Sequence, residues 1–504
     1  MDPLTERPYA PDRSFDGGDL DCGNGLLLLI RQHIDPLERG QLLEIRSTEI
    51  SVDQDLPAWC RLTRNELVSV ARHGRERRFL VCKGSLAERR ESAPPPAPAA
   101  GLRAVEVTIP GTLPSPAWAP PIAPLSVMGI GSWPRPRWLL RALHERLECR
   151  LAEEEFEAAA DDAVRLVLEA QVRSGVDVVT DGEQRRDSYA SFVGGRLDNC
   201  QLIPLTDLLA LVEHPEKLEA EMRALDVPAA EVRHPAVFGR LGRSRPLAGH
   251  ELAFAARLTD RPVKVALPGP YLLTRTLWID CIPKHVYARR EDLAVDVVRV
   301  LREEIHHLLA DGAACVQLDE PVLTEVVFTG AKKRRSFMCG ALSEKRDVGE
   351  ELAFASELLA ATLAGLPRER MALHVCRGNW TRDENAALSG DYAPLVETLA
   401  RARVGTLFLE LATPRAGDVE RLADLPGELR IGVGVVNQKL DRVESVEEIL
   451  QRARSAIAIF GAERVLLTPD CGFATFADNP LASAATAEAK LRNIALASEI
   501  LRRG

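Results

Sequence analysis

The sequence predicts an α/β protein: a (β/α)8 TIM barrel preceded by a small α+β two-layer sandwich. Three observations predict this fold. Eight apolar, β-branched runs alternate with helical segments, nearly every run ends in polar or glycine-rich residues, and a proline- and alanine-rich stretch separates the runs from a small N-terminal module. Continuous apolar strands that alternate with helices are typical of a parallel sheet covered on both faces.

The N-terminal module shows its own alternation of patterns. Gly25–Ile34 has the apolar spacing of a helix, Gln41–Ser47 has the pattern of a strand, and Asp53–Leu62 indicates a second helix. Glu66–Val70 and Arg78–Lys83 then have the patterns of two further strands. We expect the order strand–helix–strand–helix–strand–strand.

The composition sets the domain boundaries. Ser92–Pro124 is rich in proline and alanine and favours extended polyproline geometry, so it indicates a semi-rigid tether. We therefore predict a small domain over residues 1–85, a linker over 86–124 and a barrel over 125–504.

The barrel prediction rests on eight candidate strands. They are Val127–Trp133, Val176–Glu183, Val263–Pro270, Ala314–Pro321, Met371–Gly378, Thr406–Ala412, Arg430–Asn437 and Arg464–Gly472. Strongly helical segments such as Glu153–Arg173, Glu291–Ala310 and Gly349–Ala364 lie between them. The interval Gln184–Pro262 is too long for one crossover, so an inserted subdomain is expected there.

Composition and charge exclude several classes of protein. The 504 residues carry a net charge of -10 with a pI near 5.7, whereas a dedicated nucleic-acid binder is usually basic. The longest apolar stretch, Leu26–Ile30, is far too short to span a membrane, and the N-terminus does not resemble a signal peptide. Ten cysteines without the spacing of a disulfide scaffold favour a reducing, cytoplasmic location.

The polar ends of the predicted strands carry the chemistry. In a barrel these ends converge on one face, where active sites of this architecture lie. His374 and Cys376 are two residues apart on one strand and project to the same face, Glu410 ends the next strand, and Cys471 ends a strand two further on. Two thiolates, an imidazole and a carboxylate suit Zn²⁺. The alternative is a packed histidine with two buried structural cysteines.

Such a ligand set points to thiol chemistry. A free thiol has a pKa of roughly 8.5 and reacts only as its thiolate, whereas a thiol that coordinates a metal is deprotonated. Glu410 is the hard ligand of the set, so we expect an incoming thiol to add to the metal or to displace this carboxylate.

The C-terminal body resembles the catalytic half of cobalamin-independent methionine synthase. The motifs that carry the resemblance are IGSWP (130–134), VVTDGE (178–183), LDEPVL (318–323), HVC (374–376), LELA (409–412), VESVEEI (443–449) and TPDCGF (468–473). The resemblance implies that the four predicted ligands hold zinc. It also implies that Ile130, Ser132, Glu183 and Asp319 hold the amino-acid end of homocysteine. The alternative for Glu183 and Asp319 is pairing with arginines of the barrel.

Departures from the family pattern affect the methyl donor. This chain lacks the second barrel that helps to hold the folate polyglutamate in full-length relatives, and Lys439 stands where the family has a histidine near the transferring methyl group. The resemblance therefore leaves two donors open, methyltetrahydrofolate and a methylcorrinoid, the latter free or bound to a carrier protein. Trp278 is either a platform that stacks on a flat donor or a residue of the core.

The N-terminal module resembles the TusA-type sulfur carriers over residues 20–45, 55–69 and 79–84. Those carriers use a Cys-Pro-x-Pro motif at the start of the first helix, where this chain has Cys22-Gly23-Asn24-Gly25. A thiol near a helix N-terminus has a lowered pKa. Cys22 is thus a candidate persulfide carrier, and the alternative is a module that only docks a sulfur-relay protein.

Together these patterns predict a zinc-dependent methyltransferase that methylates homocysteine to methionine. An alternative is another zinc-dependent thiol alkyltransferase or lyase of organosulfur metabolism, with sulfur delivered or docked by the N-terminal module. A sulfur-trafficking scaffold with a vestigial barrel and a decarboxylase of the related porphyrin-processing barrels are weaker alternatives. The first would have lost ligands, and the second needs no thiolate site.

Overall fold

The structure is a computed structural model that describes residues 9–20, 26–73, 75–89, 112–148, 150–204, 233–279, 286–328, 347–379, 381–384 and 388–503. Its N-terminal module contains β1 (Arg13–Asp16), α1 (Leu27–Ile34), β2 (Leu42–Ser47), α2 (Val52–Leu62), β3 (Glu66–His73) and β4 (Glu76–Cys82). The predicted order of elements is confirmed.

The four strands of the module form one sheet in the order β1-β2-β4-β3. The strands β1 and β2 run parallel, whereas β4 is antiparallel to both of its neighbours. Apolar residues of α1 and α2, such as Ile30 and Leu56, pack with Leu43, Ile45 and Val81 of the sheet into a separate core. The result is a two-layer α+β unit with its own hydrophobic cluster.

The C-terminal body is built on a parallel sheet. Its strands are β7 (Lys264–Pro268), β8 (Cys315–Asp319), β9 (Met371–Val375), β10 (Thr406–Leu409), β11 (Arg430–Val436) and β12 (Val465–Pro469), which pair in sequence order. Two further segments close the ring through single parallel bridges, Val127 to Leu467 of β12, Met128 to Val178, and Val179 to Val263 beside β7. All eight predicted strands take part, so the barrel prediction is confirmed.

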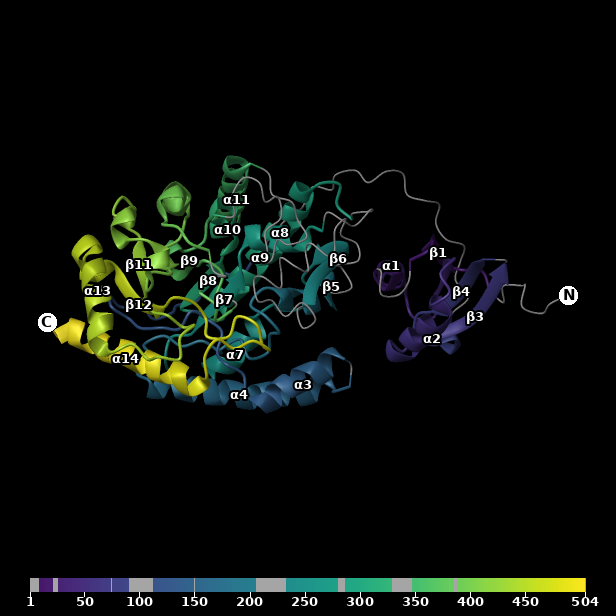
Figure 1. Cartoon of the computed structure of the whole chain (residues 1–504), viewed down its shortest axis with the longest axis horizontal. Coiled ribbons are helices and arrows are strands. Elements are labelled where there is room, and N and C mark those ends of the chain that lie inside the picture. Colours follow the sequence, from purple (N-terminus) through teal and green to yellow (C-terminus); the bar gives the residue numbers. More distant parts are fainter. Residues whose placement is uncertain are drawn as a thin grey trace.

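Helices cover the outside of this barrel. They are α3 (Arg137–Leu147), α4 (Glu153–Arg173), α8 (Pro270–Leu277), α9 (Arg290–Ala310), α10 (Val322–Phe328), α11 (Val348–Leu363), α12 (Val396–Arg401), α13 (Val446–Phe460) and α14 (Ala484–Arg503). In Figure 1, α4, α13 and α14 lie on the outer side of the strands. No helix in the described part of the chain has the length and apolar character needed to cross a membrane.

The start of α13 explains part of the VESVEEI motif. Ser445 and Glu448 form a reciprocal capping box, in which each side chain accepts a hydrogen bond from the other residue's backbone N–H. Glu444 accepts hydrogen bonds from the backbone N–H of Asn437 (2.9 Å) and from Lys490 Nζ (2.6 Å). This part of the motif therefore fixes the loop after β11 against α14.

The expected insertion lies between the second and third barrel strands. It contains the 3₁₀ helix η3 (Ser191–Gly195), the antiparallel pair β5 (Asp198–Pro204) and β6 (Arg233–Gly242), and α7 (Gly249–Ala256). The hairpin belongs to neither sheet described above.

The interior of the barrel contains a cluster of apolar side chains. This cluster consists of Met128, Ile130, Val178, Cys315, Ala372, Phe408 and Leu466. The ring of Phe408 occupies the space beside Gly432, where a Cβ atom would lie only 2.1 Å from the ring. The barrel is thus a packed core whose polar groups are concentrated at the carboxyl ends of the strands.

Candidate active site

The carboxyl ends of the barrel strands bring the predicted residues together. Asp319 is the last residue of β8, His374 lies on β9 directly opposite it in the strand register, and Cys376 follows β9. Glu410 follows β10, and Cys471 lies two residues beyond β12. All five side chains are buried.

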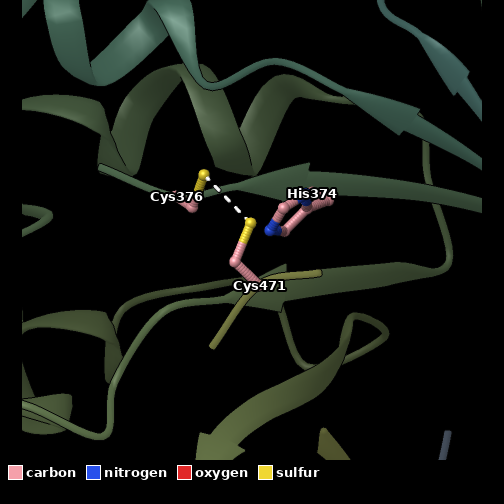
Figure 2. A group of neighbouring side chains, drawn as sticks. All are labelled: His374, Cys376 and Cys471. Atoms are coloured by element: carbon pink, nitrogen blue, oxygen red, sulfur yellow. Dashed lines mark hydrogen bonds between the residues drawn. The ribbon is translucent and has the colours of Figure 1, made fainter. Parts of the chain in front are cut away.

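His374, Cys376 and Cys471 form a compact group of donors. One donor atom from each lies within 4.8 Å of the others, and Figure 2 shows the imidazole and the two thiols pointing toward one another. The Cys471 thiol donates a hydrogen bond to the Cys376 sulfur at 3.8 Å. The Nε2 atom of His374 is buried and has no hydrogen-bond partner among the residues that the structure describes.

The protonation of this group favours a cation. The hydrogen bond from Cys471 lowers the pKa of Cys376 well below its usual value, and the same contact raises the pKa of Cys471. Burial alone would lower the pKa of His374, but Asp319 and the Cys376 thiolate raise it to about 10. A proton therefore sits on the imidazole beside a thiolate, which marks a place where positive charge is stabilised.

These residues fit a transition-metal ion. A buried imidazole nitrogen without a partner costs free energy unless something ligates it, and two sulfurs beside it supply soft donors. Sulfur and imidazole donors together are typical of zinc sites.

Glu410 is held differently from the other three predicted ligands. Its carboxylate accepts hydrogen bonds from Arg415 Nη2 (2.6 Å), the backbone N–H of Arg377 (2.9 Å) and Asn379 Nδ2 (2.9 Å). It is close enough to raise the pKa of Cys376 but is not a member of the three-residue donor group. Its role as a fourth ligand stays a prediction.

A pocket opens beside the donor group. It is lined by Ile130, Ser132, Glu183, Tyr189, Asp319, Pro321, His374, Cys376, Asn379, Cys471, Gly472, Thr475 and Phe476. The four residues predicted to hold the amino-acid end of a substrate are all among them. Their contact with such a substrate stays a prediction, but they line the same pocket as His374, Cys376 and Cys471.

Glu183 presents a buried carboxylate to this pocket. Burial raises its pKa to about 7, and within the described part of the chain its Oε2 atom has no hydrogen-bond partner. The backbone of Glu183 is in the left-handed region (φ 56°), and Arg135 fixes it by donating to the carbonyl oxygen at 2.7 Å. A Cβ atom on Gly131 would lie 2.1 Å from Glu183 Oε1, so this glycine makes room for the carboxylate.

Asp319 takes part in a buried chain of hydrogen bonds. Its Oδ1 atom accepts from His374 Nδ1 (2.9 Å) and from Gln317 Nε2 (2.7 Å). Lys264 Nζ in turn donates to Gln317 Oε1 (2.5 Å) and to the carbonyl oxygen of Ile130 (2.7 Å). Because Asp319 accepts the hydrogen bond from Nδ1–H of His374, Nε2 is the ring nitrogen that can bind a metal once its proton is released.

Lys439 and Trp278 are not among the residues that line this pocket. Lys439 is buried, and its Nζ atom has no partner among the described residues; burial and Arg415 lower its pKa, while Glu410 and Cys376 oppose this shift. Trp278 ends α8 and packs, partly buried, against the main hydrophobic cluster, and it does not line the pocket described above. Cys22 lies outside the described residues.

Two residues that support the site were not predicted. Gln317 stands in the QLDEP run and Lys264 in an apolar strand, where a buried lysine is rare and is itself a signal of a polar contact. Tyr189 and Phe476 also line the pocket, but nothing in their local sequence distinguishes them from core aromatic residues.

Comparison with known families agrees with this geometry. The family described as "Cobalamin-independent synthase, Catalytic domain" matches residues 125–497. A methionine synthase of Thermococcus kodakarensis is 27% identical over 384 residues, covering 76% of this chain and 94% of the relative. A methionine synthase of Saccharolobus solfataricus is 25% identical over 354 residues, covering 70% and 88%.

The name of a longer relative states its methyl donor. The 5-methyltetrahydropteroyltriglutamate–homocysteine methyltransferase of Thermosynechococcus vestitus is 26% identical over 361 residues, which cover 71% of this chain but 41% of the relative. The solved structure of a B12-independent methionine synthase from Shewanella sp. W3-18-1 has the same fold, with a TM-score of 0.57 and 22% identity over 76% of this chain and 98% of that one. The family match lies in the barrel, and the resemblance of residues 1–85 to sulfur carriers stays a prediction.

Proposed function

The chain belongs to the family of cobalamin-independent synthase catalytic domains, and on this premise we propose that it is a zinc-dependent methyltransferase that converts homocysteine to methionine. The observation that carries the proposal is the donor group of His374, Cys376 and Cys471 in the wall of a pocket that also holds Glu183 and Asp319. A site for a thiol and a site for an ammonium group thus lie side by side.

The metal would be held by His374, Cys376 and Cys471, with Glu410 as the further ligand. Bound there, Zn²⁺ supplies one thing to the reaction: it lowers the pKa of a substrate thiol so that the nucleophilic thiolate forms at neutral pH. For Glu410 to join the ligands, its carboxylate would have to exchange the contact with Arg415 for the metal.

The chain's own residues bind and orient the substrate. Glu183 and Asp319 bring two carboxylates to the ammonium group; Asp319 Oδ1 is occupied by His374 and Gln317, which leaves Oδ2 for that contact. Ser132 also lines the pocket and receives the carboxylate together with nearby backbone N–H groups.

We propose that Lys439 donates a proton to the methyl donor after methyl transfer. Methyl transfer forms a sulfur–carbon bond and leaves the electron pair of the broken bond on the donor, which for a methylated pterin nitrogen then takes up a proton. The buried Lys439 ammonium is unpartnered, and burial lowers its pKa, so it is suited to give up a proton to that nitrogen.

The donor that we propose is a methyltetrahydropteroylglutamate, because the relative from Thermosynechococcus vestitus is named for it. A methylcorrinoid, free or on a carrier protein, is the second candidate, because the matched region covers only 41% of the relative that is named for the pterin donor. The two donors are distinguished by the assay below.

The test is methionine formation by the purified full chain with zinc and homocysteine, offered either methyltetrahydropteroyltriglutamate or methylcobalamin. We expect methionine with the first donor and none after Cys471→Ser. Cys200→Ser is a matched control, because Cys200 is equally buried but lies in the inserted hairpin. Methionine with methylcobalamin alone would reassign the donor, and methionine with neither would refute the function.

For the N-terminal module we propose a docking or carrier role toward a sulfur-relay protein. The strand order β1-β2-β4-β3, together with α1 and α2 packed against this sheet, supports a TusA-like fold. Fast iodoacetamide labelling of Cys22 and a persulfide after incubation with a sulfur donor would favour the carrier. Slow labelling without persulfide would leave docking alone.

A further inference from the structure

A second cavity, of ≈ 280 Å³, lies between the inserted hairpin and the junction of α3 with α4. Its most prominent feature is a set of arginines. They are Arg146, Arg185, Arg186, Arg196, Arg233 and Arg245, accompanied by the carboxylates of Glu153, Asp187 and Glu251. Cations therefore outnumber anions two to one in its wall.

Two of the arginines are neutralised by close carboxylates. Arg186 pairs with Glu251 at 2.6 Å, and both side chains are almost fully buried. Arg185 pairs with Glu157 at 2.7 Å and also contacts Asp161. These pairs hold the wall in place and are structural. Even so, Arg185 Nη1 remains buried without a hydrogen-bond partner.

Three of the other arginines have no such partner among the described residues. Within the described parts of the chain, Arg196, Arg233 and Arg245 have no carboxylate at ion-pair distance. Arg245 donates only to backbone carbonyl oxygens, those of Gly195 and Arg196.

Arg196 and Arg146 are also poorly solvated. Arg196 contacts His250, whose pKa burial lowers to about 4, so this neighbour is neutral at pH 7. Burial likewise lowers the pKa of Arg196 and of Arg146, although Arg146 also forms an ion pair with Glu153 at 3.5 Å. Desolvated guanidinium groups without full compensation cost free energy, which a bound anion would offset.

We infer that this cavity binds a polyanion with at least two oxyanion groups. Guanidinium groups bind carboxylates and phosphates through paired N–H donors, and several arginines on one cavity can engage several such groups. A volume of ≈ 280 Å³ is close to the lower end of small-molecule pockets and far larger than the roughly 30 Å³ of one water.

The cavity shares a wall with the candidate active site. Glu183 and Tyr189 line the active-site pocket, whereas Arg185, Arg186 and Asp187, in the same short segment, line the arginine cavity. A ligand that occupies the cavity would therefore contact the segment that carries Glu183. An oligo-γ-glutamyl chain and an oligophosphate both carry at least two oxyanion groups. The assignment of the oligo-γ-glutamyl chain to a methyl donor rests on the proposed function.

The test measures binding and needs no turnover, so it does not depend on the proposed reaction. The full chain is titrated calorimetrically with tri-γ-glutamate and, separately, with tripolyphosphate. We expect at least one probe to bind below about 1 mM and to bind about tenfold more weakly to both Arg196→Gln and Arg245→Gln. Arg401→Gln is the control, because Arg401 is an exposed arginine on α12.

The two probes identify the source of the oxyanions. Binding of tri-γ-glutamate alone assigns the cavity to a polycarboxylate, binding of tripolyphosphate alone assigns it to a phosphate ester, and binding of both supports the shared chemistry. Thermal unfolding verifies that each variant is folded, and Arg245→Gln is informative should Arg196→Gln not fold. Failure of both probes to bind, or equal affinity in the folded variants and the wild type, would overturn the inference.

Discussion

The raised pKa of Glu183 makes amino-acid binding depend on pH. Burial holds this pKa at about 7, and an ammonium group pairs only with the ionised carboxylate. The ligand therefore favours the deprotonated form, so affinity is present above pH 7 and is lost as the pH falls through 7. For a group of that pKa, the ionised fraction falls about tenfold between pH 8 and pH 6, which corresponds to about 1.4 kcal/mol.

Methionine is the ligand of choice for this measurement. It has the ammonium and carboxylate of homocysteine but no thiol, so the ionisation of a substrate thiol does not contribute. Isothermal titration calorimetry of the full chain at pH 6, 7 and 8 should show the Kd rising about tenfold toward pH 6.

Glu183→Gln is the decisive variant. Glutamine keeps the shape of the side chain but does not ionise, so we expect weaker binding at pH 8, by about 2–5 kcal/mol, together with loss of the pH dependence. A wild-type Kd that is flat between pH 6 and 8 would refute the role of Glu183. A slope that persists in Glu183→Gln would assign the titration to another group.

Three further substitutions test the supporting contacts. Gly131→Ala would place a Cβ 2.1 Å from Glu183 Oε1 and displace that carboxylate, so methionine affinity should fall about tenfold; calorimetry that finds no change would contradict this. Gln317→Leu removes the donor to Asp319, so zinc affinity measured by chelator competition should fall about 10–100-fold, while Gln451→Leu on α13 leaves it unchanged. Burial lowers the pKa of Lys264 to about 8 in the folded protein. Between pH 8 and about 10.5 the unfolded state therefore binds more protons than the folded state, so the free energy of unfolding should rise over that range by roughly 3 kcal/mol. Lys264→Met should lack that rise in urea titrations.

The sequence was sufficient to predict the barrel because its strands are buried on both faces. Segments such as β9 are buried along their whole length and mostly apolar, and long amphipathic helices separate them, so the order of the elements indicates a parallel sheet. The bounds of α4 were predicted to the residue, since three glutamates mark its first turn and an arginine its last.

Contacts between strands were harder to predict. His374 was placed on its strand, but its pairing with Asp319 depends on the register of β8 against β9, which no local pattern encodes. The hydrogen bonds of Gln317 and Lys264 also link neighbouring strands, so local sequence patterns do not encode them either. The contact between Glu410 and Arg415 depends on how the loop after β10 folds back, and strand patterns contain no information about that.

The zinc content of the purified full chain tests the central claim most directly. We expect about one zinc per chain, with X-ray absorption showing Zn–S distances near ~2.3 Å, and loss of most of the metal from His374→Ala and Cys471→Ser. Cys200→Ser should retain it. Equal zinc content in wild type, His374→Ala and Cys471→Ser, or a spectrum without sulfur at that distance, would contradict the account.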